Sequence, residues 1–414
     1  MIALAIFAIW ILASLSLLSW LYILLHPARP WDFQPVGDDV PLPELPAGVT
    51  FPSVAVLVPA RNEADSLPNT LPALLSQDYP GTFRVILIDD RSQDGTADVA
   101  RSIAEKLNTS ARLTVLRGLP LPDGWTGKVW ALDQGVKEAA KTQSEFVLLT
   151  DADILHRVNS LRRLVAESIN GELGMNSRMA RLRCESPAEK LLIPAFVYFF
   201  NLLYPMRRIN SRDDTLAGAA GGCVLLSAEA VKRLDGGFAS IKNEIIDDVN
   251  LARQVKKSGL PIGLSLSRDE VLSLRDYPQL MDIWKMVRRT AFTELKYSWA
   301  RLFGAMAGLA LMFVVPVLAF GFGLLAFLLC ADPGMRMFAL VACAKGMVSL
   351  LVMRSVYTPA VRFFNLPARF AFSLPLAGCL YGLMTIDSAL RHARRARTEW
   401  REVVPANQPA AGPN

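Results

Sequence analysis

The sequence has few histidines and no closely paired cysteines, and these shortages argue against several kinds of site. Its three histidines lie far apart along 414 residues, which disfavours a multi-histidine metal centre and a Ser-His-Asp triad. None of the five cysteines forms a CxxC pair, and three of them lie in apolar stretches. Neither a disulfide framework nor a zinc site is therefore expected. The GxGxxG and Walker A phosphate-binding spacings are also missing.

Charge is absent from the first 25 residues. A helix of that length crosses the hydrocarbon core of a bilayer. A cleaved secretory signal peptide is the alternative, but the segment has neither a basic start nor an evident small-residue cleavage site. We expect a retained transmembrane anchor over residues 1–25, and a Pro- and Asp-containing linker over residues 26–50.

Three apolar stretches lie in the last third of the chain, at Leu302–Cys330, Phe338–Met353 and Phe370–Leu390. They predict two to three transmembrane helices within residues 301–390, although the second stretch is short and contains Lys345. A cytosolic catalytic domain places the N-terminus outside, and three further spans would place the basic segment after residue 390 outside as well. A re-entrant or interfacial stretch would remove this conflict, and so would an unrecognised division of the stretches. The sequence leaves both open.

The net charge of +6 and the pI of about 9.1 are compatible with a nucleic acid or an anionic membrane as partner. Most basic residues are scattered, but one cluster directly follows an apolar stretch, and this favours the membrane over nucleic acid. We expect residues 391–414 to form a basic and then disordered tail. The clustered residues are Arg391, Arg394, Arg395, Arg397 and Arg401.

Between the two apolar ends, β-rich and helical patterns alternate. Short apolar runs at Val54–Val58, Val85–Ile88 and Phe146–Leu149 predict buried strands of a mostly parallel sheet, with helices between them. This order predicts an α/β domain over residues 51–300. The apolar and aromatic segment Ile193–Met206 fits a core helix and a membrane-surface helix equally well.

Acidic residues follow the ends of two of these strands, where ligands bind in open α/β sheets. Asp151 and Asp153 come directly after the third strand, and at that spacing both carboxylates can point to one side. Such oxygen ligands suit Mg²⁺ or Mn²⁺ together with a diphosphate. Asp89 and Asp90 follow the second strand, and either charge complementarity with the next helix or the binding of ligand donors explains them.

Asp247 and Asp248 precede a predicted helix, and capping competes with a general-base role for them. Two further groups each have a functional and a structural interpretation. Lys128 could contact a phosphate, or it could be an ordinary solvated lysine. Gly221 and Gly222 could let a substrate approach the backbone closely, or they could simply allow tight packing. Arg288 and Arg289 suit diphosphate contact or contact with lipid headgroups.

Taken in order, these motifs resemble the family 2 inverting glycosyltransferases of the GT-A fold. Pro59-Ala-Arg-Asn-Glu63 is similar to the family's first nucleotide-binding motif, with Arg61 where an aromatic residue is common. Leu87-Ile-Asp-Asp90 is similar to the second, and implies that Asp90 contacts the nucleobase. Thr150-Asp-Ala-Asp153 is similar to the metal-binding DxD motif, and implies that Asp151 and Asp153 hold the metal.

A fourth motif of the resemblance lies further along the chain. Gly236-Gly-Phe238 followed by Ile246-Asp-Asp-Val-Asn-Leu251 is similar to the family's Glu-Asp motif, with Asp247 replacing Glu. The resemblance implies that Asp248 is the general base. The QxxRW motif of processive synthases is absent, and Lys285-Met-Val-Arg-Arg-Thr290 stands near its place, which favours a single transfer.

The overall layout resembles the hopanoid-associated glycosyltransferases of the HpnB type. This resemblance implies a nucleotide-diphosphate sugar donor, a UDP-sugar above all, and a triterpenoid lipid acceptor. It also implies a multi-pass protein of the bacterial inner membrane with a cytosolic catalytic domain. Polyprenyl phosphate, a sphingolipid or glycerolipid, and a carotenoid acid remain alternative acceptors. An inactive membrane scaffold with a glycosyltransferase-like fold is the alternative of another class.

Overall fold

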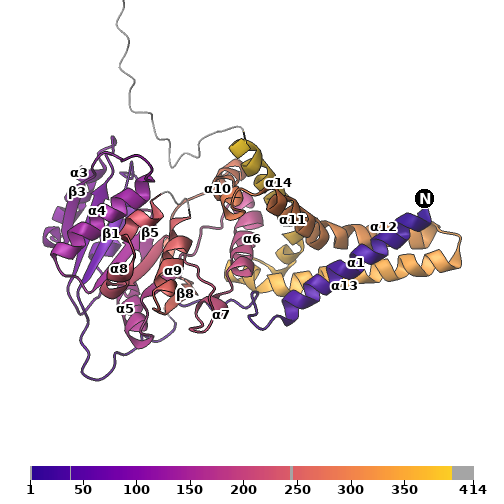
Figure 1. The fold of residues 1–414 in the computed structure, drawn as a ribbon, viewed down its shortest axis with the longest axis horizontal. Coiled ribbons are helices and arrows are strands. Elements are labelled where there is room, and N and C mark those ends of the chain that lie inside the picture. The colour runs from indigo at the N-terminus through magenta and orange to yellow at the C-terminus, as the bar shows by residue number, and fades with distance from the viewer. Residues whose placement is uncertain (1, 38, 243–245, 394–414) are drawn as a thin grey trace, which may run out of the picture.

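The computed structural model describes residues 2–37, 39–242 and 246–393. Figure 1 shows an α/β domain at one end and long helices that extend from it at the other. The predicted disordered tail lies almost entirely outside the described residues. The α/β domain is built on one large sheet, and the helices α6 (Pro187–Leu203) and α10 (Leu280–Glu294) lie between it and the long helices.

The large sheet has the strand order β3-β2-β1-β4-β7-β6-β8 within the described residues. All neighbouring strands pair in parallel except β7, which is antiparallel to both β4 and β6. The predicted mostly parallel sheet is thus confirmed. A small second sheet pairs β5 (Ile154–His156) with β9 (Val271–Ser273). The large sheet comprises β1 Val54–Ala60, β2 Phe83–Asp89, β3 Leu113–Arg117, β4 Phe146–Thr150, β6 Met175–Met179, β7 Cys223–Ser227 and β8 Ile262–Leu266.

Strand β1 is apolar without interruption because both of its faces are buried. Its side chains alternate between two cores: Leu57 packs into one, and Val56 and Val58 into the other. Because helices cover both faces of the sheet, both sets of side chains are removed from water. The surrounding helices are α2 Leu67–Leu75, α3 Thr96–Lys106, α4 Gly127–Lys141, α5 Ser160–Asn170, α7 Met206–Ile209, α8 Ala228–Arg233 and α9 Asp247–Lys257.

Strand β6 has no counterpart among the apolar runs because its sequence is Met-Asn-Ser-Arg-Met. Its Arg178 is fully buried all the same. The guanidinium donates to Glu167 at 2.8 Å and to Ser265 Oγ at 2.6 Å, and Glu270 lies 3.8 Å away. A buried charge is tolerated when it is paired in this way. Ser265 and Glu270 come from distant parts of the chain, so local patterns do not reveal the strand.

Helix α6 is a core helix, so the ambiguity over Ile193–Met206 is decided. It begins at a capping box between Ser186 and Glu189 and lies between the sheet domain and the long helices. The backbone oxygen of Leu192 accepts a hydrogen bond from the Tyr381 hydroxyl at 2.9 Å, and Asn201 donates to the oxygen of Pro30 at 2.6 Å. These bonds join the two parts of the molecule.

Four segments within the described residues are long and apolar enough to cross a membrane. One is N-terminal and three are C-terminal, at Ala3–Leu25, Trp299–Leu329, Pro333–Phe363 and Ala368–Ala393. This confirms the expected count of candidate spans. The helices that form them are α1 Ile2–Leu25, α11 Trp299–Leu309, α12 Val315–Leu329, α13 Pro333–Phe363 and α14 Leu374–Ala393, with a π-helical segment joining α11 to α12.

Helix α13 corrects the expectation that the second apolar stretch is short, because it runs over 31 residues. The sequence pattern was interrupted by Lys345, but the folded chain gives this residue partners. Its ammonium donates to Ser14 Oγ of α1 at 2.6 Å and lies 3.6 Å from the centroid of the Trp10 ring. The hydrogen bond and the cation–π contact stabilise a charge inside a helix bundle.

Candidate active site

Three neighbouring parallel strands, β2, β1 and β4, end at the same edge of the sheet. Ala60 at the end of β1 is paired with Asp89 at the end of β2, and Leu57 is paired with Leu149 of β4. Asp151 follows β4 directly. The register therefore brings the predicted motifs at Pro59, Asp89–Asp90 and Asp151 to one edge, as the sequence indicated.

Asp90 is almost completely buried at this edge. Its carboxylate is 3.3 Å from the Arg61 guanidinium and 4.0 Å from that of Arg91, and its backbone N–H donates to the oxygen of Ala60. Burial raises the pKa of Asp90, whereas Arg61 and Arg91 oppose that rise. Arg61 is thus the ion partner of Asp90, the residue that the sequence resemblance predicts to contact the nucleobase. The resembled family commonly has an aromatic residue at the position of Arg61.

The loops after β1 and β2 are bonded to each other. The backbone N–H groups of Asn62 and Glu63 donate to Ser92 Oγ and Thr96 Oγ1, each at 2.9 Å. Asp94 accepts from the N–H of Ala64 at 3.0 Å, a role that the sequence analysis missed because nothing distinguishes it from other loop acids. Asp89 accepts from the N–H of Ser92, and Glu63 accepts from the Ser66 hydroxyl at 2.7 Å. These bonds hold the two loops in one shape beside Asp90.

A second cluster forms around Lys128, in the first turn of α4. Its ammonium lies 2.6 Å from Asp151 and 3.5 Å from the backbone oxygen of Gly221. The N–H of Gly221 donates in turn to Asp248 Oδ2 at 2.8 Å, and the N–H of Val249 donates to Oδ1 at 2.8 Å. Lys128, Asp151, Gly221 and Asp248 therefore come together from four separate segments of the chain.

Gly221 is where the backbone approaches this cluster closely. A Cβ atom there would lie 3.3 Å from Asp248 Oδ2 and 3.4 Å from Lys128 Nζ, and one at Gly222 would lie 3.2 Å from the side chain of Ile154. Contacts of this length are tighter than most side chains tolerate. The glycines therefore let the loop before β7 pack against the acidic cluster.

Asp248 and Lys128 have shifted acidities. Burial, followed by repulsion from Asp247, raises the pKa of Asp248 to about 7, and Lys128 partly opposes the rise. Burial disfavours the charged form of Lys128, but attraction to Asp151, Asp247 and Asp248 outweighs this and raises the pKa of Lys128. A carboxylate that titrates near neutral pH is suited to general-base chemistry.

The two arginines predicted near the site are separated by the structure. Burial and the neighbouring Arg275 lower the pKa of Arg289, while Tyr277, Asp247 and Asp151 oppose the shift, so Arg289 lies beside the acidic cluster. Its buried Nε has no hydrogen-bond partner among the described residues. Arg288 instead lies 3.3 Å from Asp387 of α14, away from the cluster.

Asp151 and Asp153 are the two carboxylates for which the sequence predicts a metal ion, and in the structure Asp151 is paired with Lys128. The Asp153 carboxylate lies 3.9 Å from Arg275, a neighbour that the sequence did not reveal. No group of three or more histidine, cysteine or acidic side chains in the described part of the chain is arranged to hold a metal. The protein therefore offers a donor set that fits Mg²⁺ or Mn²⁺ only when ligand oxygens complete it.

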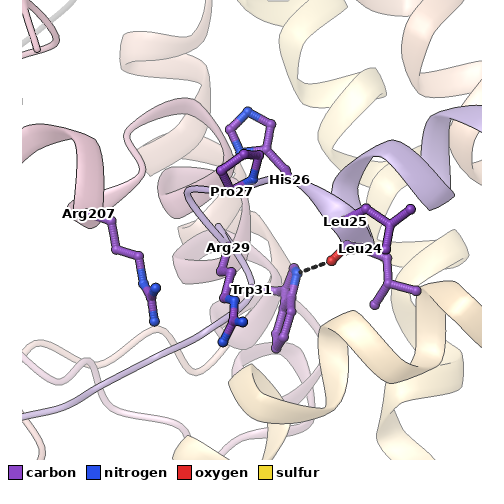
Figure 2. Close-up of a pocket in the computed structure, with 7 residues that line it drawn as sticks. All are labelled: Leu24, Leu25, His26, Pro27, Arg29, Trp31 and Arg207. Atoms are coloured by element: carbon purple, nitrogen blue, oxygen red, sulfur yellow. Dashed lines mark hydrogen bonds between the residues drawn. The ribbon is translucent and has the colours of Figure 1, made fainter.

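A separate cavity of about 540 Å³ lies at the end of α1, away from the acidic cluster. Figure 2 shows Arg29 next to Trp31 and Arg207 on the other side of Arg29. The indole N–H of Trp31 donates to the backbone oxygen of Leu24 at 3.2 Å. Arg207 is paired with Asp32 at 2.6 Å. The cavity thus has cationic and aromatic walls at the point where α1 meets the α/β domain.

The comparisons with known proteins concern mainly the α/β domain. Residues 55–235 match the model of the family described as Glycosyl transferase family 2. This segment contains the loops at Asp90, the Asp151–Asp153 pair and Lys128, and it ends before Asp248. The match therefore indicates the same class of domain, a family 2 glycosyltransferase, that the sequence motifs resemble. It does not extend to Asp248, the predicted general base.

Among curated proteins, the chain is similar to 4,4'-diaponeurosporenoate glycosyltransferases of Staphylococcus aureus. In strain bovine RF122 / ET3-1 the identity is 29% over 215 residues, covering 51% of this chain and 53% of the relative. In strain USA300 it is 28% with the same coverage. The chain spans about half the length of the curated relatives that it matches.

Two solved structures align more weakly. The mannosyltransferase PcManGT from Pyrobaculum calidifontis, solved in complex with GDP-Man and Mn²⁺, has 18% identity and a TM-score of 0.48, covering 96% of this chain and 99% of that one. The glucosyl-3-phosphoglycerate synthase of M. tuberculosis has 18% identity and a TM-score of 0.37, covering 59% of this chain and 80% of that one.

Proposed function

We propose that this chain is a membrane-bound glycosyltransferase that moves a single sugar from a nucleotide-diphosphate sugar to a lipid hydroxyl, with inversion. The family match over residues 55–235 supports the reaction class. The observation that carries the mechanism is Asp248, a carboxylate with a pKa raised to about 7, held by two backbone N–H groups beside Lys128 and Asp151.

The donor occupies the edge of the sheet in this proposal. The bonded loops after β1 and β2, with Pro59, Glu63 and the Arg61–Asp90 pair, form the nucleotide site, and a UDP-sugar is the expected donor. The diphosphate lies toward Lys128 and Arg289, whose charges oppose its own. The buried Nε of Arg289 has no hydrogen-bond partner among the described residues, and this supports the placement because a ligand oxygen would satisfy it.

Mg²⁺ or Mn²⁺ would be held by Asp151 and Asp153, with diphosphate oxygens and water completing the coordination. Bound there, the ion would supply positive charge for the departing nucleoside diphosphate. Lys128 lies 2.6 Å from Asp151, so in the absence of an ion the chain itself neutralises this carboxylate.

Asp248 then takes the proton of the acceptor hydroxyl. The acceptor oxygen forms a bond to the anomeric carbon while the bond from that carbon to the diphosphate oxygen breaks. Attack from the face opposite the leaving group inverts the anomeric centre, through an oxocarbenium-like transition state. The two N–H bonds fix the carboxylate, one to each oxygen, so that it is pre-oriented for this step.

The acceptor class divides the proposal into two versions. A hopanoid-type acceptor presents a hydroxyl and needs a base, whereas a carotenoid acid or polyprenyl phosphate attacks as an anion and needs none. The curated relatives are named for diaponeurosporenoate, which favours the acid as the second candidate. We place the enzyme in the bacterial inner membrane with its catalytic domain in the cytosol.

Lipid profiling of a deletion strain tests this function. Strains complemented with the wild type, with Asp248→Asn and with the exposed control Asp98→Asn are compared for glycolipids. We expect one glycolipid to vanish on deletion, to return with the wild type and Asp98→Asn, and to stay absent with Asp248→Asn. Full restoration by Asp248→Asn would favour an anionic acceptor. An unchanged lipid profile on deletion would contradict the transferase and favour the inactive scaffold.

A further inference from the structure

Three of the four apolar segments form one bundle. Figure 1 shows α1, α12 and α13 running together away from the α/β domain, with the N-terminus near the far tip. A Cβ atom at Gly346 of α13 would lie 2.5 Å from the backbone N of Phe320 in α12, so these helices touch along their backbones. The Trp20 indole of α1 donates to the oxygen of Met312, just before α12.

Helix α14 is placed differently. It packs against α10, α11 and α6, beside the α/β domain, and its last turn lies on that side of the molecule. Asp387 accepts from the Trp284 indole at 2.7 Å, and Ser388 both donates to the oxygen of Arg288 at 2.6 Å and accepts from the N–H of Phe292. These bonds tie α14 to α10, an amphipathic helix that carries Lys285, Arg288 and Arg289 and that could not enter hydrocarbon at low cost.

The outer face of α14 is an exposed apolar stripe. Leu376, Leu383 and Leu390 recur every seven residues and are 56%, 52% and 44% exposed. Trp299 and Phe303 of the neighbouring α11 are also exposed, at 53% and 78%. A helix with one apolar outer face and one polar, docked face is suited to lie in the plane of a membrane interface.

The distribution of positive charge agrees with this position. Arg301 lies in the first turn of α11, which follows α10, and Arg362 lies in the last turn of α13, whose end meets Arg181 of the α/β domain through Phe363. Arg369 follows in the short segment before α14, and the cavity of Figure 2 adds Arg29 at the end of α1. At the far tip, near the turn between α12 and α13, the described residues include only Arg336 as a basic side chain. Positive residues concentrate on the cytoplasmic side of membrane proteins. A spanning α14 would carry the arginine-rich tail to the opposite side.

We infer that α14 does not cross the membrane but lies along its surface on the catalytic side, with its apolar stripe in the headgroup and acyl boundary. Among the described segments, only α1, α13 and the combination of α12 with the preceding π-helical segment Ala310–Val314 then span the bilayer. The end of α14 at Ala393 then lies on the same side of the membrane as the α/β domain. This removes the conflict between the count of apolar stretches and the position of the basic tail, and it places the α/β domain directly at a membrane surface through α10 and α14.

Cysteine labelling of the full chain in intact spheroplasts and in inverted vesicles tests the sidedness. Cys330, at the far turn, reports one side, and Asp98→Cys, on the exposed face of α3, reports the other; Ala393→Cys reports the end of α14. All variants carry serine at positions 184 and 379, and those other than the Cys330 reporter carry serine at position 330 as well. With a membrane-impermeant maleimide, we expect position 393 to label in the same preparation as position 98. Labelling together with Cys330 would overturn the inference.

A depth measurement distinguishes a surface helix from one without membrane contact. Nitroxide spin labels at Leu383→Cys of α14 and at Leu324→Cys of α12 are compared in vesicles of phosphatidylethanolamine and phosphatidylglycerol. We expect the label at 383 to be shallow and the label at 324 to be deep, judged from accessibility to oxygen and to a water-soluble nickel complex. Equal depth would show that α14 spans, and a fully aqueous label at 383 would show that the stripe does not face lipid. Neither result depends on glycosyl transfer.

Discussion

At the scale of single residues, the site depends on how a few charges share a partly buried space. Asp248 lies among Asp247, Lys128 and the backbone of Gly221, and its pKa is raised to about 7 mainly because burial disfavours its charged form. Each pKa unit corresponds to about 1.4 kcal/mol. Burial of this carboxylate therefore lowers the free energy of unfolding at neutral pH, and in exchange the site has a carboxylate that can accept a proton.

The pH dependence of turnover follows from this pKa. Because the base must be ionised, kcat/KM for the wild type should rise with pH through about 7 and then level off. Lys128 lowers the pKa of Asp248, so Lys128→Met should move the rise to higher pH as well as reduce the rate. Steady-state kinetics between about pH 5.5 and 9 measures both effects.

Lys137→Met is the matched control for this experiment. Lys137 lies on the same helix, and its largely exposed side chain pairs with Asp133, which is mostly buried. Its removal should leave the pH profile unchanged. A rate that does not vary with pH in the wild type, or an unmoved profile in Lys128→Met, would contradict the assignment of Asp248.

At the scale of elements, β6 shows how a polar segment becomes a central strand. Arg178 is fully buried, and it joins β6 to Glu167 of α5 and to Ser265 of β8. The neighbouring Glu270, whose pKa is raised by burial against the opposing charges of Arg178 and Arg163, also depends on this network. The strand is held in the sheet by ion pairs as well as by its apolar neighbours.

Arg178→Met should therefore be strongly destabilising. Removing one partner of a buried ion pair costs about 3–5 kcal/mol, and here Glu167 loses its ion pair with Arg178 while Glu270 keeps only Arg163. Thermal unfolding in detergent, followed by circular dichroism, should show a lowered midpoint. Arg212→Met, which removes an exposed pair with Glu172, should leave the midpoint nearly unchanged. Equal midpoints for the two variants would mean that the buried network contributes little.

At the scale of the whole molecule, α10 connects the site to the membrane helices. One of its two adjacent arginines, Arg289, lies beside the acidic cluster, while Arg288 and Trp284 contact Asp387 of α14. The docking of α14 thus fixes the orientation of α10, and with it the position of Arg289. Asp387 is a positioning residue in this arrangement, since it acts only through α10.

Asp387→Ala should lower kcat/KM without moving the pH profile. If about 1.4 kcal/mol of positioning is lost, the decrease is roughly tenfold. Turnover in membranes with matched protein amounts measures it, and the unmoved pH profile separates this effect from that of Lys128→Met. Asp387→Asn keeps an oxygen that can accept from the Trp284 indole, so it should retain more activity. A shifted profile in Asp387→Ala would indicate a direct effect on Asp248.

The sequence determined much of the fold because its signals are local. Val54–Val58, Val85–Ile88 and Phe146–Leu149 are buried on both faces, and their unbroken apolar runs followed directly from that burial. Polar motifs after these strands then had to meet at one sheet edge, since parallel neighbours end together. The first 25 residues were similarly readable, because nothing in them is charged.

Only the tertiary structure decided which charged side chains are buried. A buried charge is stable only beside suitable partners, and these partners are remote in sequence. A charge at Arg178 in an interior strand or at Lys345 in a long apolar helix would be unfavourable alone, and the fold stabilises them by placing Glu270 and Ser14 beside them. The sequence does not distinguish the adjacent Arg288 and Arg289. In the structure, Arg288 is paired with Asp387 of α14, whereas Arg289 lies beside the acidic cluster. By hydropathy alone α14 is a candidate transmembrane helix. Its hydrogen bonds to the polar helix α10 are visible only in the folded chain, and they are the basis for placing it at the membrane surface instead.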